Sequence, residues 1–179
     1  GMPMPPLALQ DEVSLSLGWH VAEQTRKDRE AEGKPVPMHP GLPIIDKMVN
    51  SLDRPGKKAG KGFYDYEGRN KALWSGLKEH WPTTTELPMQ DMQDRLLYIQ
   101  AIETARCVEE GVVEKTNDAN IGSIFGWGFA PWSGGTLQFI NAIGVAKFVE
   151  RAEELAAQYG ERFSPPQLLK DMAASGKTF

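Results

Sequence analysis

The chain carries few side chains that could act as nucleophiles, bases or metal ligands. They are His20 in a stretch with helical spacing, His39 in a proline-rich segment, His80 beside a tryptophan, and the single cysteine, Cys107. Neither a cysteine nor a carboxylate stands at ligand spacing from a histidine, so we expect structural or surface histidines and no metal site. One cysteine cannot form an internal disulfide, and its place in a helical pattern favours a small apolar role over catalysis.

A turn rich in glycine and lysine is the clearest candidate for anion binding. It spans residues 56–66 and reads Gly-Lys-Lys-Ala-Gly-Lys-Gly-Phe-Tyr-Asp-Tyr. Its backbone N–H groups and lysines could bind phosphate, but the Walker spacing is absent, and no predicted strand precedes it. The other interpretation, which we favour, is a tight reversal whose Phe63, Tyr64 and Tyr66 pack onto helices.

Two charged pairs flank the clearest helical pattern of the chain. Asp94-Arg95 stands near its start and Glu109-Glu110 at its end. Both are expected to be solvated helix turns, the first favourable to the helix dipole and the second not. With no nucleophile beside a base, no catalytic carboxylate pair and no metal cluster, the residues alone predict no active site.

Composition and charge exclude several classes of function. The net charge of −4 and the pI near 5.5 give no basic surface for nucleic acid. No apolar run approaches the roughly 18 residues that a membrane helix needs. The absence of a signal-peptide pattern and the single cysteine favour a reducing compartment, and we expect the cytoplasm.

Helical periodicity dominates the elements that would position these residues. The clearest helix is predicted from Met89 to Glu110, with one apolar stripe at positions 97, 101, 105 and 108 and a second at 92, 96 and 99. Ser14 or Ser16 is expected to cap one helix, and Asn117 or Asp118 another. Further helices are expected over 6–13, 15–29, 44–49, through Ile121 and Phe125, over 137–143 and 145–159, and after Pro166.

The chain also repeats itself. A proline-rich entry precedes Leu7, Leu9, Asp11, Val13 and Leu15, and Pro131-Trp132 precedes Leu137, Phe139, Asn141, Ile143 and Val145. A second echo relates residues 43–48 to 166–172. We therefore predict an all-α fold built from a duplicated helical unit, with a truncated first copy at 2–69, a linker at 70–88 and a second, degenerate copy at 89–179.

These motifs resemble the C-terminal helical region of 3-hydroxyacyl-CoA dehydrogenases, in particular the long type found in multifunctional fatty-acid β-oxidation enzymes. The entry Pro3-Met4-x-Pro6-Leu7-x-Leu9-x-Asp11-x-Val13 is similar to that family's segment before its substrate-facing helix. The glycine-lysine turn with its three aromatics is similar to the family's characteristic ending. Residues 94–97, 126–135 and the last helix resemble the second copy of the long enzymes. The fold implied is like the C-terminal domain of 6-phosphogluconate dehydrogenase.

The resemblance implies a function for a longer protein rather than for this chain alone. A Rossmann domain would bind NAD and supply the catalytic residues, and this region would form a substrate wall over acyl-CoA and an assembly surface. No glycine-rich dinucleotide fingerprint occurs here, so we expect no bound cofactor and no catalysis by the chain itself. Asp94 stands where the family has an asparagine, and an aspartate cannot donate the amide hydrogen bond.

The substrate-facing candidates are Pro3, Met4, Pro5 and Leu9, although Pro5 replaces a glycine of the family pattern. The alternative function is a self-standing helical module for docking or dimerisation. The helix that should cover Leu7, Leu9, Val13, Leu17 and Ile44 is expected upstream of Gly1. Either a homodimer covers that face, or the helix at 89–110 serves both copies within a monomer.

Overall fold

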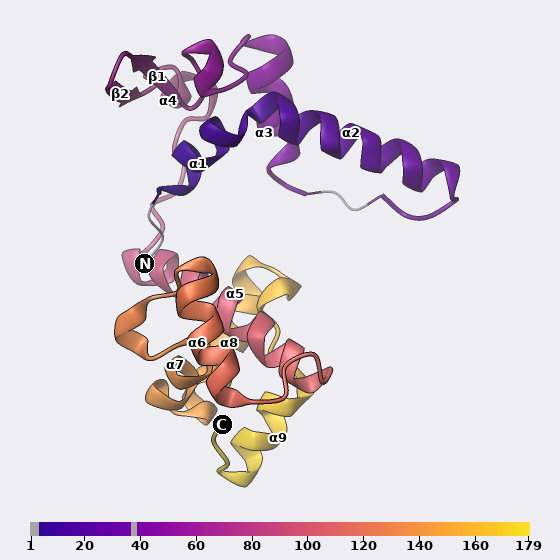
Figure 1. Ribbon diagram of the computed structural model, residues 1–179, viewed down its shortest axis with the longest axis vertical. Helices are drawn as coiled ribbons and strands as arrows, with labels where there is room; N and C mark the ends of the chain where they lie inside the picture. Colours follow the sequence, from indigo (N-terminus) through magenta and orange to yellow (C-terminus); the bar gives the residue numbers. More distant parts are fainter. Residues whose placement is uncertain (1–3, 37–38) are drawn as a thin grey trace. The chain divides into compact units, whose positions relative to one another are not determined.

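The computed structural model describes residues 4–36 and 39–179 and divides them into two compact units, Met4–Thr84 and Thr85–Phe179 (Figure 1). Both units are helical, as the sequence predicts, apart from one small antiparallel hairpin in the described part of the first. None of the described helices is both long enough and apolar enough to cross a bilayer.

The first unit begins with two helices in direct succession. A short helix and a π-helical turn follow the loop after α2, and the glycine-lysine turn leads into the hairpin. The elements are α1 (Pro6–Val13), α2 (Leu15–Ala31), α3 (Leu42–Asp46), η1 (Lys47–Ser51), η2 (Lys57–Ala59), β1 (Tyr64–Glu67), β2 (Asn70–Leu73) and α4 (Leu77–His80). The hairpin pairs Tyr64 with Leu73 and Glu67 with Asn70.

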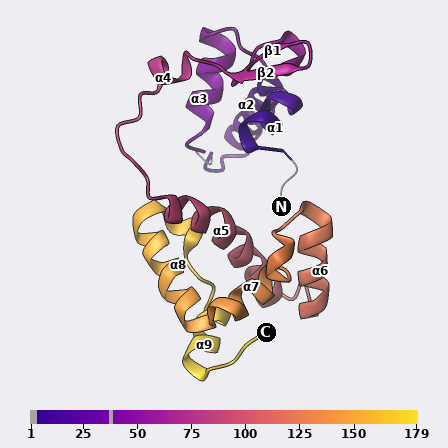
Figure 2. The same cartoon turned by 90° about the vertical axis from the view of Figure 1, so that its left-hand side faces the viewer.

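The second unit is built around one long helix. Helices α5, α7, α8 and α9 enclose its core, and α6 packs against α7 (Figure 2). Its elements are α5 (Met89–Glu109), α6 (Thr116–Trp127), η3 (Pro131–Ser133), α7 (Thr136–Ile143), α8 (Val145–Tyr159), η4 (Glu161–Phe163) and α9 (Gln167–Ser175).

Each unit has its own hydrophobic core. In the first unit, Leu15, Met48 and Phe63 are buried. Trp74, Leu77 and Trp81 pack against them, so residues 70–81 belong to this compact unit. The core of the second unit is larger, and in it Tyr98 of α5 stacks on Phe148 with ring centroids 4.3 Å apart. The copy boundaries at 69 and 89 stay a prediction, because compactness does not test where a repeat ends.

The backbone supports the internal duplication. Helix α1 has eight residues and ends at Ser14 with φ 84 and ψ 120, after which α2 begins at once. Helix α7 also has eight residues and ends at Gly144 with φ 92 and ψ 124, after which α8 begins. The same left-handed break therefore joins the corresponding helix pairs in the two units.

Substitution by alanine should have opposite effects on stability at two glycines of the second unit, one at this break and one inside a helix. A Cβ at either Gly144 or Gly122 would meet nothing within 4 Å, but only Gly144 has positive φ. Gly144→Ala should lower the free energy of unfolding by about 1–2 kcal/mol, because alanine is strained there. Gly122→Ala, inside α6, should raise it by about 0.5–1 kcal/mol. Urea unfolding followed by circular dichroism checks both, and effects of the same sign would contradict the strain argument.

Three details of the helices differ from the sequence prediction. Neither Ser14 nor Lys115, which precede α2 and α6, makes a side-chain cap, so Ser14, Ser16, Asn117 and Asp118 do not cap as predicted. The Ser14 hydroxyl instead bonds Pro55 O at 3.1 Å. Helix α2 continues to Ala31, past the predicted end near Arg29.

The buried face of α5 agrees with one of the two predicted apolar stripes. Ala101 and Ala105 of the first stripe are fully buried, and Leu97 and Val108 pack against the core. The second stripe is wrong in part, because Met92 and Leu96 are exposed. Tyr98 and Ile102, which neither stripe included, extend the buried face beside Ala101 and Ala105.

Candidate functional site

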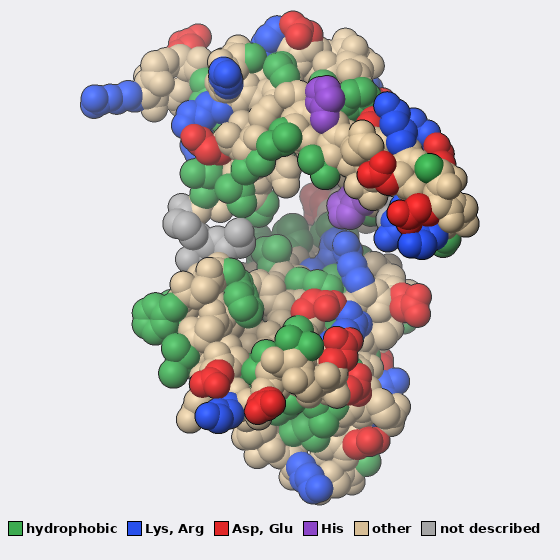
Figure 3. Space-filling view, turned by 45° about the vertical axis from the view of Figure 1, so that its right-hand side comes forward, with side chains coloured by type: hydrophobic (Ala, Val, Ile, Leu, Met, Phe, Trp, Pro, Cys, Tyr) green, Lys and Arg blue, Asp and Glu red, His purple; other side chains and the backbone are tan. Residues whose placement is uncertain are grey.

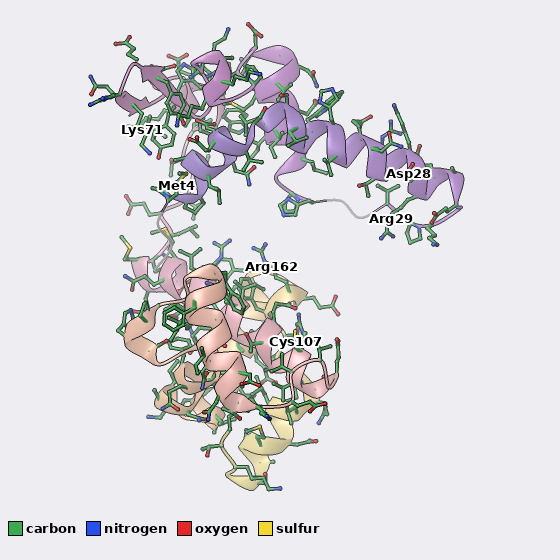
Figure 4. All side chains as sticks on the ribbon, in the orientation of Figure 1. Met4, Asp28, Arg29, Lys71, Cys107 and Arg162 are labelled. Atoms are coloured by element: carbon green, nitrogen blue, oxygen red, sulfur yellow. The ribbon has the colours of Figure 1, made fainter. Side chains whose placement is uncertain are left out.

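The predicted substrate-facing residues lie around the start of α1. Pro3 lies outside the described residues. Met4 is half-buried, and Pro5 is the extended residue before α1, with φ −60 and ψ 145 (Figure 4). Leu9 lies on α1 and is 38% exposed. They share one end of the first unit, and their role toward a substrate stays a prediction.

One buried carboxylate of this unit, to which the sequence assigned no function, accepts several hydrogen bonds. The Asp11 carboxylate is fully buried on α1. It accepts hydrogen bonds from Phe63 N at 2.8 Å, Tyr64 N at 2.9 Å and the Tyr66 hydroxyl at 2.9 Å. Burial, followed by this hydrogen bond, raises the pKa of Tyr66, so its phenol remains a donor. Asp11 therefore fixes the end of the glycine-lysine turn to α1.

Two glycines of the turn are required by this close approach. A Cβ at Gly62 would lie 2.1 Å from Asp11 Oδ1, and one at Gly56 would lie 2.9 Å from Asp11 O. Gly56 also has φ 131. Packing between distant segments therefore fixes Asp11, Gly56 and Gly62 relative to one another, and no local sequence signal could have identified Asp11.

Arg54 holds the other side of the same segment. Its guanidinium donates to Gly62 O at 2.7 Å and Tyr64 O at 3.2 Å, and forms an ion pair with Asp65. It also lies over the Trp74 ring at 4.1 Å. Arg54 is buried, and no sequence pattern predicted a role for it.

These contacts decide between the two interpretations of the glycine-lysine turn. Lys57 is paired with Glu12 and Lys61 with Asp53, each at 2.6 Å. The Gly60 and Gly62 N–H groups bond carbonyls of the turn itself. The structure therefore supports the packing interpretation over phosphate binding, because two of the turn's three lysines and the Gly60 and Gly62 N–H groups already have partners.

The second unit repeats the anchor with different chemistry. Asn141, the repeat counterpart of Asp11, accepts from Phe179 N at 3.1 Å and donates to Phe179 O at 3.2 Å. The sequence Gly176-Lys177-Thr178-Phe179 thus ends on α7 as Gly60-Lys61-Gly62-Phe63 ends on α1. An amide suits this position because it must donate as well as accept.

Asp94 is buried rather than solvated, which corrects the expectation for the pair Asp94-Arg95. Its carboxylate accepts from Arg151 Nε at 2.8 Å and from Gln90 Nε2 at 2.7 Å. Arg151 also pairs with Asp91 at 2.6 Å. The carboxylate at the place of the family's asparagine is therefore part of an ion-pair cluster between α5 and α8.

The three histidines lie apart from one another. His20 is exposed and bonded to Ser16 O, and His39 Nδ1 accepts from Gly41 N at 3.1 Å. His80 lies between the rings of Trp74 and Trp81. Within residues 4–36 and 39–179, no three histidine, cysteine or carboxylate side chains gather as metal ligands would.

Comparisons with known proteins match the first part of the chain to one family. Residues 1–66 match the family described as 3-hydroxyacyl-CoA dehydrogenase, C-terminal domain. All of the chain aligns with fatty acid oxidation complex subunit alpha, at 35% identity over 187 residues in Shewanella amazonensis, covering 25% of that protein. The identity is 31% over 181 residues in Vibrio parahaemolyticus, covering 25%, and 36% over 189 residues in Pseudomonas aeruginosa, covering 26%.

The chain thus spans about a quarter of the length of the curated relatives it matches. The family match ends at residue 66, in keeping with a second copy that is more divergent than the first. Residues 1–66 therefore match a 3-hydroxyacyl-CoA dehydrogenase C-terminal domain, and the whole chain is homologous to the C-terminal quarter of fatty acid oxidation complex alpha subunits.

Proposed function

We propose that this chain is the substrate-wall and assembly region of an NAD-dependent 3-hydroxyacyl-CoA dehydrogenase of fatty-acid β-oxidation. In this role it contributes the start of α1, with Met4, Pro5 and Leu9, to a surface facing acyl-CoA. Hydride transfer takes place on a Rossmann domain that is not among the residues described here. The alignment of the full chain with one quarter of the alpha subunits carries this proposal.

The uncovered face of the first unit supports the assembly role. In the second unit, Leu137 and Phe139 of α7 are buried, and Tyr98 of α5 lies edge-on to Phe139 at 5.9 Å. Their repeat counterparts Leu7 and Leu9 are 40% and 38% exposed. Val13 and Leu17 are also more than half exposed, and Figure 3 shows hydrophobic side chains, in green, at the surface of the described residues. Ile44, predicted to belong to this face, packs against the core of its unit instead.

The described residues do not fit NAD. Their only sheet is a two-stranded antiparallel hairpin, whereas dinucleotide sites follow a parallel strand and open a helix. In the glycine-lysine turn, Lys57 and Lys61 pair with Glu12 and Asp53, and the Gly60 and Gly62 N–H groups bond carbonyls of the turn. We therefore assign NAD to the longer protein and derive no catalytic step within this chain.

A chimera tests the proposed function. In the Pseudomonas aeruginosa alpha subunit, this chain replaces the quarter with which it aligns. The chimera should oxidise a 3-hydroxyacyl-CoA with formation of NADH, while the subunit lacking that quarter and the isolated chain should not. A chimera that folds and binds NADH but shows no turnover would overturn the proposal, as would NADH formation by the chain alone.

The alternative, a docking module that dimerises, rests on the same exposed face of α1 and α2. Light scattering at micromolar concentration should then give a dimer, and Leu9→Asp with Leu17→Asp should convert it to a monomer, because charges on an apolar interface prevent association. Val112→Asp is the matched control, since Val112 is 70% exposed on the second unit. A monomeric mass for the unmodified chain would exclude this alternative.

A further inference from the structure

A groove between α5 and α6 of the second unit is not used by the proposed function. It encloses about 600 Å³. Its lining comes from α5, the following loop and α6, namely Ile99, Gln100, Glu103, Thr104, Cys107, Val113, Asp118, Ala119, Gly122, Gly126 and Trp127. We propose that this groove binds an uncharged, apolar small molecule of the long-chain aliphatic or aromatic class.

The shape of the groove fits a small molecule. Binding pockets for such ligands measure about 300–1,000 Å³ and are mostly apolar. A Cβ added at Gly122 or Gly126 would meet nothing within 4 Å, so these glycines do not serve close packing of the two helices. A hydrogen bond from Trp127 Nε1 to Gln100 Oε1 at 2.9 Å joins the two helices beside the groove. The space is therefore built into the helix pair.

The polar groups in the lining select against an anion. The Gln100 amide donates to Leu96 O at 2.6 Å, and the Thr104 hydroxyl donates to Gln100 O at 2.9 Å. With Trp127 also engaged, the lining side-chain donors have partners within the chain. The charged groups of the lining are the carboxylates of Asp118 and of Glu103, the latter paired with Arg106, and the lining contains no lysine or arginine that would bind a carboxylate or phosphate. A neutral apolar ligand meets these conditions.

Cys107 provides a specific reporter of occupancy. It lies on α5, lines the groove, and is the single cysteine of the chain (Figure 4). Its rate of alkylation by N-ethylmaleimide, followed by mass spectrometry of the intact protein, therefore measures access to this groove. A bound ligand should slow that rate.

The probe is N-phenylnaphthylamine, a neutral dye whose fluorescence rises in apolar surroundings, titrated with the full chain. Dodecanol should displace the dye and slow alkylation of Cys107. Dodecanoate and the anionic dye anilinonaphthalene sulfonate should bind at least about tenfold more weakly, because the lining carries the Asp118 carboxylate and no cationic side chain.

Filling the groove supplies the decisive variant. Gly122→Leu should weaken dye binding by at least about tenfold through steric overlap, with a melting temperature at or above that of the unmodified chain. Gly18→Leu is the matched control, because Gly18 is also a helical glycine whose Cβ would meet nothing within 4 Å. Dye binding that survives Gly122→Leu, Cys107 alkylation unaffected by dodecanol, or equal affinity for the anionic probes would each overturn the proposal.

Discussion

Asp11→Ala should lower the free energy of unfolding of the first unit by about 3–5 kcal/mol, and it is the largest single-residue effect we expect. The fully buried carboxylate serves two backbone N–H groups and one hydroxyl. Each buried donor left without an acceptor costs roughly 1–3 kcal/mol. The stability of Asp11→Asn should fall between that of the unmodified chain and that of Asp11→Ala. Its amide oxygen keeps part of these hydrogen bonds, whereas its NH₂ group faces a donor.

Amide hydrogen exchange gives the local measurement. The Phe63 and Tyr64 amides should exchange much faster in Asp11→Ala, while the amides of α7 and α8 keep their protection. Asn141→Ala is the matched control in the other unit, where only two bonds to Phe179 are lost, at about 1 kcal/mol net. Equal losses from the two substitutions would show that Asp11 is not the anchor described here.

Arg151→Ala should destabilise the second unit by about 2–3 kcal/mol, because its ion pairs are partly buried. Removing one partner costs about 0–1 kcal/mol for exposed pairs and about 3–5 kcal/mol for fully buried ones. Arg151 bonds Asp91, Asp94 and Glu154 at 2.6, 2.8 and 2.9 Å. The side chain of Asp94 is only 12% exposed, so its charge would be left without compensation.

Arg26→Ala is the matched control for this prediction. Arg26 also bonds two carboxylates, Glu23 and Glu30, both at 2.9 Å, but on the exposed surface of α2. Exposed pairs contribute about 0–1 kcal/mol. Chemical denaturation should therefore distinguish the two variants, and similar losses of stability would contradict the assignment of Arg151 as the partly buried centre of an ion-pair cluster.

The same cluster gives a pH dependence. The hydrogen bond from Tyr159, followed by that from Arg151, lowers the pKa of Asp91 below its ordinary value of 3.8. A lowered folded-state pKa stabilises the fold above the unfolded-state value and loses that contribution as pH falls through the folded-state value. The difference between Arg151→Ala and the unmodified chain should accordingly shrink below about pH 4, as measured by urea unfolding over a pH series.

The helical spacing of apolar residues and the positions of glycine and proline were enough to predict most of the fold. Helix α5 begins at the predicted Met89 and α8 ends at the predicted Tyr159. The repeat of alternating apolar residues after a proline corner also predicted that α1 and α7 correspond. These signals are local, because glycine and proline limit the backbone whatever packs against it.

Burial of charge could not be predicted in this way. Asp11 and Asp94 stand in helices where an aspartate is ordinarily solvated. Only tertiary contacts, with a turn more than fifty residues away for Asp11 and with Arg151 for Asp94, show that they are interior. The groove beside α6 had no sequence signal either, because glycines at helical spacing equally describe two helices in close contact.

The two separate cores have a consequence for how the stability of this chain is defined. They share no residue, and residues 82–88, which join α4 to α5, contain neither helix nor strand. When two cores unfold independently, the chain shows two cooperative unfolding transitions and not one. A single melting temperature would then average two quantities, and calorimetry should show a van't Hoff enthalpy smaller than the calorimetric one.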